Sequence, residues 1–153
     1  MVRLADIPEP ERTVIANLDC PSYPQTPFTR ARPAPERHVA IVSSAGFIVR
    51  GERPLLANES GYREIAAEVS DNDILCSHVS TNFDRTGFQQ DLNVMLPRDR
   101  LKELEGDGSI GRAADIHYSF MGATAPGKLE HKARELGGKL LALGVNTVVL
   151  APV

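Results

Sequence analysis

The sequence predicts an α/β fold with a mostly parallel sheet, flanking helices and a three-layer, Rossmann-like arrangement. The most regular helical pattern lies at 128–143, where leucines and an alanine recur at helical spacing, and Gly144 follows it directly. This pattern leads straight into 146–151, a continuous apolar run typical of a strand in the interior of a parallel sheet. A helix that feeds such a strand is the second half of a βαβ unit, which indicates the α/β class.

The first 36 residues differ in composition from the rest of the chain. Seven of the prolines precede residue 36, whereas every glycine lies at Gly46 or later. Apolar residues at helical spacing favour a short helix over 6–18, and the prolines that follow favour extended backbone over 20–37. We therefore expect an N-terminal helix and a Pro-rich extended arm at 1–36, followed by an α/β domain at 37–153.

Short apolar runs separated by turn residues predict the other elements of this domain. Strands are expected at 38–43, 73–78 and 114–120, and a helix that begins at Pro97 is expected to end at 106–108. Residues 64–68 fit either a helical turn or a strand. The polar stretch 81–90 is expected to be a loop.

Composition and charge exclude several classes of protein. With 153 residues, 42% of them hydrophobic and 24% charged, the chain can form one globular domain and differs from disordered, collagen-like and coiled-coil proteins. A formal charge of −3 and an aromatic content of 5% argue against nucleic-acid partners. No apolar stretch approaches the roughly 20 residues that span a bilayer, and the first residues do not resemble a secretory signal. A cytoplasmic location without membrane contact is therefore expected.

The two cysteines, Cys20 and Cys76, show neither metal-binding nor disulfide spacing, so two reduced thiols are expected. Cys76 lies in an apolar strand, where a cysteine usually behaves as a small hydrophobe rather than as a nucleophile. No cofactor is predicted, and metal binding is left open.

Parallel sheets bind ligands beyond the carboxyl ends of their strands, which here are 43–46, 77–78 and 119–122. His78 stands at one of these ends, with Asp84 and Asp91 in the next segment. A histidine and two carboxylates could form a general base with its orienting partner, or a metal site. The alternative is a histidine that only satisfies the backbone groups of its loop.

His117 and Ser119 lie two residues apart in a predicted strand, so they share a face and could line a pocket together. The alternative for His117 is a partly buried histidine that is hydrogen-bonded to backbone.

Eight short motifs stand in a fixed order along the domain. They are residues 38–46, 61–65, 77–78, 91–94, 97–101, 110–111, 117–122 and 144–152. Over about residues 37–153, this ordered set resembles the glycine/sarcosine/betaine reductase selenoprotein B family, which includes the D-proline reductase subunit. The resemblance implies reductive cleavage of a C–N bond, in which a selenocysteine or cysteine attacks a substrate amine held by a pyruvoyl group on a partner subunit.

The resemblance also implies that only part of the reductase site is present. The family's nucleophile follows the strand that resembles 147–152, and the sequence stops at Val153, so we expect a protein that lacks its own nucleophile. The expected catalytic residues are His78, His117 and Asp91. The expected ligand-binding residues face a common pocket and are Ser43, Ser44, Gly46, Tyr62, Asn93, Ser119, Met121 and Gly122. No metal site is predicted, although His78, Asp84 and Asp91 are the set that could form one.

Three functions remain as alternatives. The chain could be a stand-alone member of the reductase superfamily that binds a small amino-acid-like or carboxylate ligand, with acid–base work by His78 or His117. It could be a subunit of a split reductase whose catalytic thiol or selenol lies on a partner chain. It could also be a binding or scaffold protein that kept the fold without catalysis. The expected partners are a small-molecule ligand and either further copies of the chain or a complementary reductase subunit, because the last strand is expected to leave an unprotected sheet edge.

Overall fold

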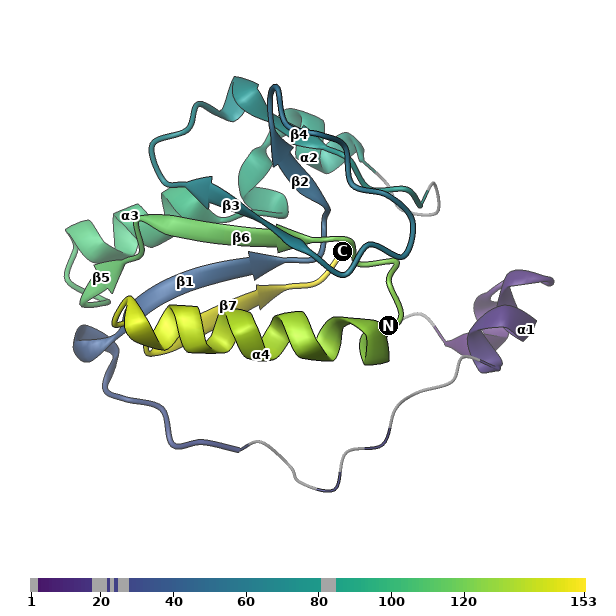
Figure 1. Ribbon diagram of the computed structural model, residues 1–153, viewed down its shortest axis with the longest axis horizontal. Coiled ribbons are helices and arrows are strands. Elements are labelled where there is room, and N and C mark those ends of the chain that lie inside the picture. Colours follow the sequence, from purple (N-terminus) through teal and green to yellow (C-terminus); the bar gives the residue numbers. More distant parts are fainter. Residues whose placement is uncertain (1–2, 18–21, 23, 25–27, 81–84) are drawn as a thin grey trace.

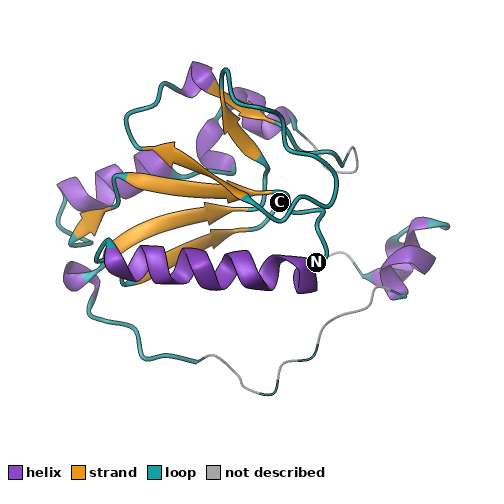
Figure 2. Cartoon of the chain, in the orientation of Figure 1, coloured by secondary structure: helices purple, strands orange, loops and turns teal. Residues whose placement is uncertain are grey.

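The computed structural model describes residues 3–17, 22, 24, 28–80 and 85–153. It contains a five-stranded mixed sheet that is mostly parallel (Figures 1 and 2). The strands of this sheet are β1 His38–Ser43, β3 Tyr62–Ala66, β5 Arg112–Ala113, β6 Ile116–Phe120 and β7 Thr147–Ala151. The prediction of an α/β fold with a mostly parallel sheet is confirmed.

The central strand is β1, in which every residue after His38 is buried. Such a continuous apolar run is typical of a strand covered on both faces. β1 pairs in parallel with β5 and β6 along one edge and with β7 along the other. β3 pairs antiparallel with β6, so β3 and β7 form the two outer edges of the sheet.

Helix α4, Pro126–Ala142, covers one face of the sheet, and helix α3, Arg98–Gly106, lies on the other face (Figure 1). The alternation of side chains along β1 separates two apolar clusters. Its residues 40 and 42 pack in the cluster that contains α4 side chains, whereas residues 39 and 41 pack in the cluster that contains α3 side chains. The sheet is therefore covered from both sides.

A second, two-stranded antiparallel sheet pairs β2 Phe47–Val49 with β4 Ile74–Cys76. The remaining α-helices of the described residues are α1 Glu11–Ala16 and α2 Thr86–Gln90. Short 3₁₀ turns are formed by Leu4–Asp6, Ala34–Glu36, Asp71–Asp73 and Leu92–Val94.

Most predicted elements of the domain are confirmed, with ends that differ by a few residues. β1, β4, β6, β7, α3 and α4 lie where strands and helices were expected, and the ambiguous stretch 64–68 overlaps strand β3. The loop predicted at 81–90 is wrong for its last five residues, because Thr86–Gln90 forms α2. This short helix is held by packing, since the ring of Phe88 lies 5.1 Å from that of Phe47.

The N-terminal part agrees less closely with the prediction. The helix expected at 6–18 is formed over the shorter range Glu11–Ala16. Residues 18–21, 23 and 25–27 lie outside the described residues, so the Pro-rich extended arm stays a prediction. The Rossmann-like layering and the division of the chain after residue 36 also stay predictions.

Candidate functional site

Three predicted ligand-binding loops meet at the carboxyl edge of the sheet. The amide of Gly122, after β6, donates a hydrogen bond of 3.1 Å to the carbonyl of Ser44, after β1. The hydroxyl of Ser44 accepts a 2.8 Å bond from the amide of Val153, after β7. On the other side, the amide of Ser77 donates to the carbonyl of Gly46 at 3.0 Å. Segments far apart in the sequence are thus joined into one surface.

Two glycines allow these loops to approach closely. Gly46 has a φ of 67°, and a Cβ added to it would lie 3.2 Å from the Cα of His78. A Cβ on Gly122 would lie 2.6 Å from the carbonyl oxygen of Ser44, which is closer than side-chain carbons come to backbone. Both positions therefore require glycine for the geometry of the site.

The buried serines hold the loop that follows β1. Ser119 is fully buried, and its hydroxyl donates to the carbonyl of Ser43 at 3.0 Å and accepts from the amide of Phe47 at 2.8 Å. The hydroxyl of Ser43 accepts from the amide of Ala45 at 3.2 Å. These bonds fix the backbone of residues 43–47 at the edge of the sheet.

His78 lies beside this loop and is 8% exposed. Its Nδ1 accepts a 3.1 Å hydrogen bond from the amide of Ser80, and Arg85 donates to the carbonyls of both residues. Burial, followed by the charge of Arg85, lowers the pKa of His78 below its usual value. The ring is therefore neutral at pH 7, and because Nδ1 accepts a bond, its proton lies on Nε2.

His117 occupies a different environment, inside the core. It is 1% exposed, on the face of β6 that turns toward α3, and its Nδ1 accepts a 3.2 Å bond from the amide of Ile41. Burial lowers its pKa to about 4, and the nearby charges of Arg98 and Lys102 act in the same direction. This is the hydrogen-bonded, buried histidine that the sequence left open as an alternative.

Asp91 and Asn93 are bonded to each other. The carboxylate of Asp91 accepts from the amide and the side chain of Asn93, both at 2.9 Å, and this bonding lowers its pKa. The side chain of Asn93 also bonds to the start of α3, through the side chain and the amide of Asp99. Together with Asp71 these residues line a polar cavity of about 340 Å³.

The predicted metal set stays untested as a whole, because Asp84 lies outside the described residues. Within the described ranges, no group of three or more His, Cys, Asp or Glu side chains is placed to hold a metal ion.

Tyr62 lies on the α4 face at the start of β3, which is antiparallel and so begins at the same carboxyl edge. It lines an apolar cavity of about 220 Å³ beneath the first half of α4, with Phe120 and Leu150 among the other walls. Its hydroxyl donates to Glu135 at 3.2 Å. Met121 is fully buried in a small apolar cluster that includes Leu55. Its side chain therefore packs in the interior, and does not face the surface of the site.

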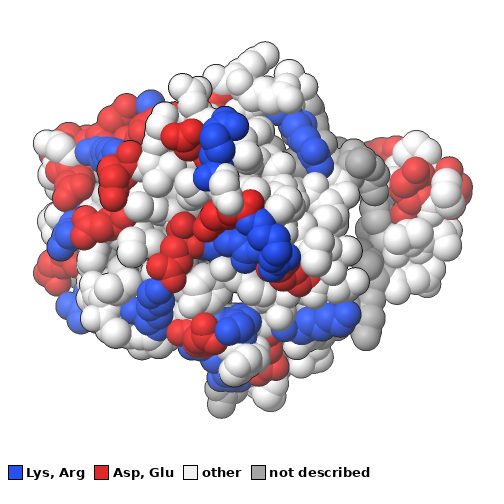
Figure 3. Space-filling model, turned by 45° about the horizontal axis from the view of Figure 1, so that its top comes forward, with Lys and Arg blue, Asp and Glu red and all other residues white. Residues whose placement is uncertain are grey.

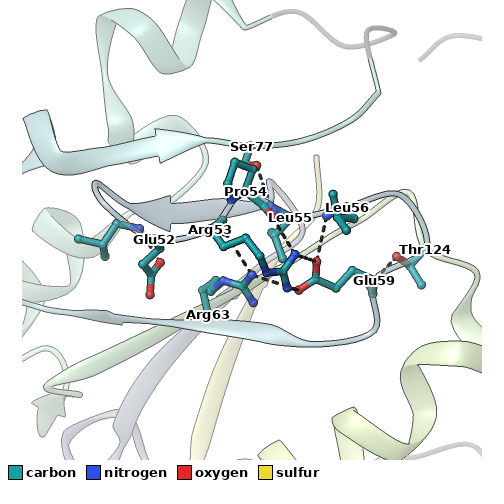
Figure 4. A network of polar contacts seen from close by, with 10 residues as sticks. Glu52, Arg53, Pro54, Leu55, Leu56, Glu59, Arg63, Ser77 and Thr124 are labelled. Carbon is teal, nitrogen blue, oxygen red and sulfur yellow. Dashed lines mark hydrogen bonds and ion pairs between the residues drawn. The ribbon is translucent and has the colours of Figure 1, made fainter.

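No sequence pattern predicted the network of charged side chains that lies next to the candidate site. Arg53 donates two bonds to the Glu59 carboxylate, at 2.9 and 3.2 Å, and Arg63 donates another at 3.1 Å (Figure 4). Burial raises the pKa of Glu59, but the hydrogen bonds from the Leu56 amide and the two guanidinium groups outweigh it and leave the pKa lowered.

This network is tied to the candidate site at both ends. The amide of Leu55 donates to the Ser77 hydroxyl at 2.9 Å, and the Thr124 hydroxyl donates to the carbonyl of Glu59 at 2.8 Å. The spacing of residues 53, 59 and 63 fits no local motif, so only the folded loop brings them together.

Three further observations concern the surface charge, the thiol of Cys76 and the lengths of the helices. On the face drawn in Figure 3, acidic and basic side chains are interspersed and form no large field of one sign. Cys76 is half-buried, and its thiol donates to the carbonyl of Ala45 at 3.4 Å, beneath the loop. Among the described helices, none is long and apolar enough to cross a membrane.

Comparisons with known proteins all indicate the same protein family. Residues 24–153 match the family described as glycine/sarcosine/betaine reductase selenoprotein B. The D-proline reductase subunit gamma of Acetoanaerobium sticklandii is 31% identical over 115 residues, which cover 73% of this chain and 47% of the relative. The glycine reductase complex component B subunit gamma of Symbiobacterium thermophilum and the sarcosine reductase complex component B subunit beta of Peptoclostridium acidaminophilum are each 27% identical over 139 residues.

These two relatives are matched over 84% of this chain but only 32% of their own length. The chain therefore spans about half the length of the first relative and about a third of the other two. No solved structure gives a significant match.

Proposed function

Since this chain belongs to the glycine/sarcosine/betaine reductase selenoprotein B family, we propose that it binds a small carboxylate or amino-acid-like ligand as part of a reductase. The proposed site is the carboxyl edge of the sheet, at 44–46, 77–78 and 121–122. The observation that supports it most is the cross-bonding of these loops through Ser44, Gly46 and Gly122. Ligands of parallel α/β sheets bind at this edge.

The chemistry of the ligand follows from His78. A neutral imidazole whose Nδ1 accepts from the Ser80 amide carries its proton on Nε2, and an imidazole N–H is a hydrogen-bond donor. Glycine, sarcosine, betaine and proline, the compounds in the names of the family and its relatives, share a carboxylate. A carboxylate accepts from such a donor, so we assign His78 to orienting the ligand's carboxylate.

The described residues hold no thiol poised for attack at this edge. The Cys76 thiol is bonded to the carbonyl of Ala45, beneath the loop and not on its outer side. We therefore propose that the thiol or selenol required for reductive C–N cleavage comes from outside the described residues.

A split reductase is the second candidate, and a specific observation favours it. The relatives are named as subunits, two of them as subunits of reductase complexes, which implies partner subunits for those relatives. In this form of the proposal, the chain supplies the ligand-orienting half of the site and a partner supplies the nucleophile.

The test is calorimetric titration of the chain with glycine, sarcosine, betaine and D-proline, for the wild type and for His78→Asn. Asparagine retains an acceptor for the Ser80 amide but has no donor at the position of Nε2. We expect at least one of the four compounds to bind, and the variant to bind it at least about tenfold more weakly, as expected for the loss of one hydrogen bond to a charged group. His131→Asn, on the exposed side of α4, is the matched control and should bind as the wild type does.

Two results would contradict the proposal. If none of the four compounds binds, the carboxyl edge is not a site for this ligand class, and a scaffold role without ligand becomes the better explanation. If His78→Asn keeps its melting temperature and also its affinity, the ligand does not contact His78.

A further inference from the structure

Phe28 is almost fully exposed to water, although its side chain is large and apolar. It is 95% exposed, whereas every other aromatic side chain among the described residues is at least partly buried. Residues 28–33 form neither helix nor strand and are exposed throughout. Aromatic rings supply much of the apolar area that proteins bury. The ring of Phe28 is therefore available for contact with another surface.

The apolar cavity beside Tyr62 has the size and the walls of a site for such a ring. Its volume of about 220 Å³ exceeds the roughly 150 Å³ of an engineered apolar cavity that binds benzene. Tyr62 and Phe120 supply two aromatic walls, and aromatic rings attract one another in edge-to-face arrangements. Leu150 forms part of a third wall and is 73% exposed, so a ring in the cavity would cover it.

The polar groups at this cavity are bonded to one another. The hydroxyl of Tyr62 donates to the carboxylate of Glu135 at 3.2 Å, and the ammonium of Lys132, another wall residue, donates to the same carboxylate at 2.6 Å. The side of the cavity formed by α4 includes Leu129 and Leu136 and is apolar. A charged group placed inside would lose hydration that apolar walls do not replace, whereas an uncharged ring would not.

The segment that carries Phe28 is anchored at the amino edge of the sheet. The side chain of Asn146 donates to the carbonyl of Glu36 at 3.0 Å, just before β1 begins. Gly111 packs so closely against the same stretch that an added Cβ would lie 2.5 Å from the carbonyl oxygen of Pro35. Residues 35–36 are thus fixed, and the segment that precedes them is tethered to the sheet at this point.

This tether is long enough for the ring to reach the cavity. The five residues from Pro33 back to Phe28 span about 16 Å in an extended chain. The strand from His38 to Val42, which is a wall of the cavity, spans about 13 Å. In Figure 1 the segment leaves the amino side of the sheet and runs below α4 toward the carboxyl side. The ring can therefore reach the cavity while residues 35–36 stay in place.

We propose that Phe28 inserts its ring into the cavity beside Tyr62, so that residues 28–33 lie along the side of α4. In the structure the ring lies outside the cavity, and insertion needs only backbone rotations between residue 28 and Pro33, where no proline intervenes. Val42 and Phe120 precede Ser44 and Gly122 by two positions, so the inserted ring would lie next to the loops of the candidate site. The contact itself requires no ligand.

The sequence contains no tryptophan, so Phe28→Trp introduces a single fluorescent reporter. We expect its emission at shorter wavelength than that of the control Val14→Trp, which places the reporter at a 63% exposed position of α1. Iodide should quench Phe28→Trp at least about threefold less strongly than the control, because contact with side chains excludes the ion. Ala133→Phe, added to the Phe28→Trp protein, fills the cavity and should restore strong quenching. Ala142→Phe, at the exposed end of the same helix, is the matched control and should leave the emission unchanged.

A second measurement keeps the native ring, because indole is larger than phenyl. Trypsin cleaves after Arg30, two residues from Phe28. We expect this cleavage to be at least about fivefold faster in Phe28→Ala and in Ala133→Phe than in the wild type, since the docked segment has to leave the surface before a protease can bind it. Ala142→Phe should be cleaved at the wild-type rate. Where the two measurements differ, the trypsin result decides.

Three results would overturn the inference. The first is equal trypsin cleavage of the wild type and Phe28→Ala, with Phe28→Trp quenched as strongly as Val14→Trp. The second is an Ala133→Phe variant that keeps its melting temperature and changes neither measurement, because the ring then packs elsewhere. The third is protection found only in a dimer, which would place the ring in the cavity of a second copy. All measurements are made without ligand, so their failure would leave the proposed ligand binding at His78 unaffected.

Discussion

Acid should destabilise this fold through His117, and the size of the effect follows from its burial. The pKa of His117 is lowered from 6.5 to about 4 in the folded protein. Above pH 6.5 the ring is neutral in both the folded and the unfolded state, and the histidine adds no pH dependence. As the pH falls from 6.5 toward 4, the unfolded state binds a proton that the folded state does not bind, so the free energy of unfolding decreases.

The magnitude comes from the pKa difference. One pKa unit corresponds to about 1.4 kcal/mol, so the full shift corresponds to a loss of about 3 kcal/mol by pH 4. This is a large share of the roughly 5–15 kcal/mol that stabilises a typical domain. The loss has a structural cause, because a charged ring at this position would be 1% exposed and close to the charges of Arg98 and Lys102.

The assay is urea unfolding followed by circular dichroism at pH values from 7.5 to 4, for the wild type and for His117→Asn. Asparagine can accept from the Ile41 amide as the ring nitrogen does, but it does not titrate. The variant loses stability at every pH because of its smaller side chain, yet the wild type should lose about 3 kcal/mol more between pH 7 and pH 4. Parallel curves for the two proteins would refute the reasoning, since other groups would then cause the pH dependence.

Two further substitutions test the architecture of the site. Gly122→Ala places a Cβ 2.6 Å from the carbonyl oxygen of Ser44, so we expect a loss of about 1–3 kcal/mol and weaker ligand binding. A melting temperature equal to that of the wild type would mean that the two loops separate easily. Glu59→Gln removes the charge shared by Arg53 and Arg63, and we expect about 1 kcal/mol of lost stability, because Arg53 is largely exposed and water screens its pairing. Limited proteolysis should cut 53–60 faster in this variant, and equal cleavage rates would show that the network does not order the loop.

The sequence predicted those elements in which local pattern and burial agree. Helix α4 has a clear apolar face and β7 is a continuous apolar run, so both were found with nearly correct ends. Helix α2 was missed because its local sequence favours a helix only weakly. It carries Gly87 and has no capping side chain, and the contact of Phe88 with Phe47 that holds it is long-range.

In the candidate site too, some contacts could be predicted from the sequence and others could not. The loops after β1 and β6 were expected to meet because carboxyl ends of parallel strands share an edge, and the bond from Gly122 to Ser44 has that geometry. The sequence placed Asp91 near His78 by chain proximity alone and left open whether the two side chains pair. In the structure Asp91 bonds to Asn93 and caps the turn Leu92–Val94, a local bond that the carboxylate reaches without any long-range contact.

The hydrogen bonds of His78 and His117 bear on the chemical role that each ring can have. In both rings Nδ1 accepts a backbone amide hydrogen, so at neutral pH the nitrogen that could take a proton is already occupied. The acid–base role expected for these rings stays a prediction, and proton uptake at either Nδ1 would require its backbone bond to break. Protonation of His117 would also destabilise the fold. His78 differs in position, since it lies beside the Gly46 loop, at the proposed ligand site. In the proposed reaction, a donor at the ligand's carboxylate leaves the amine end free for bond cleavage. The proposed orientation by His78 is therefore compatible with attack by a thiol or selenol from elsewhere.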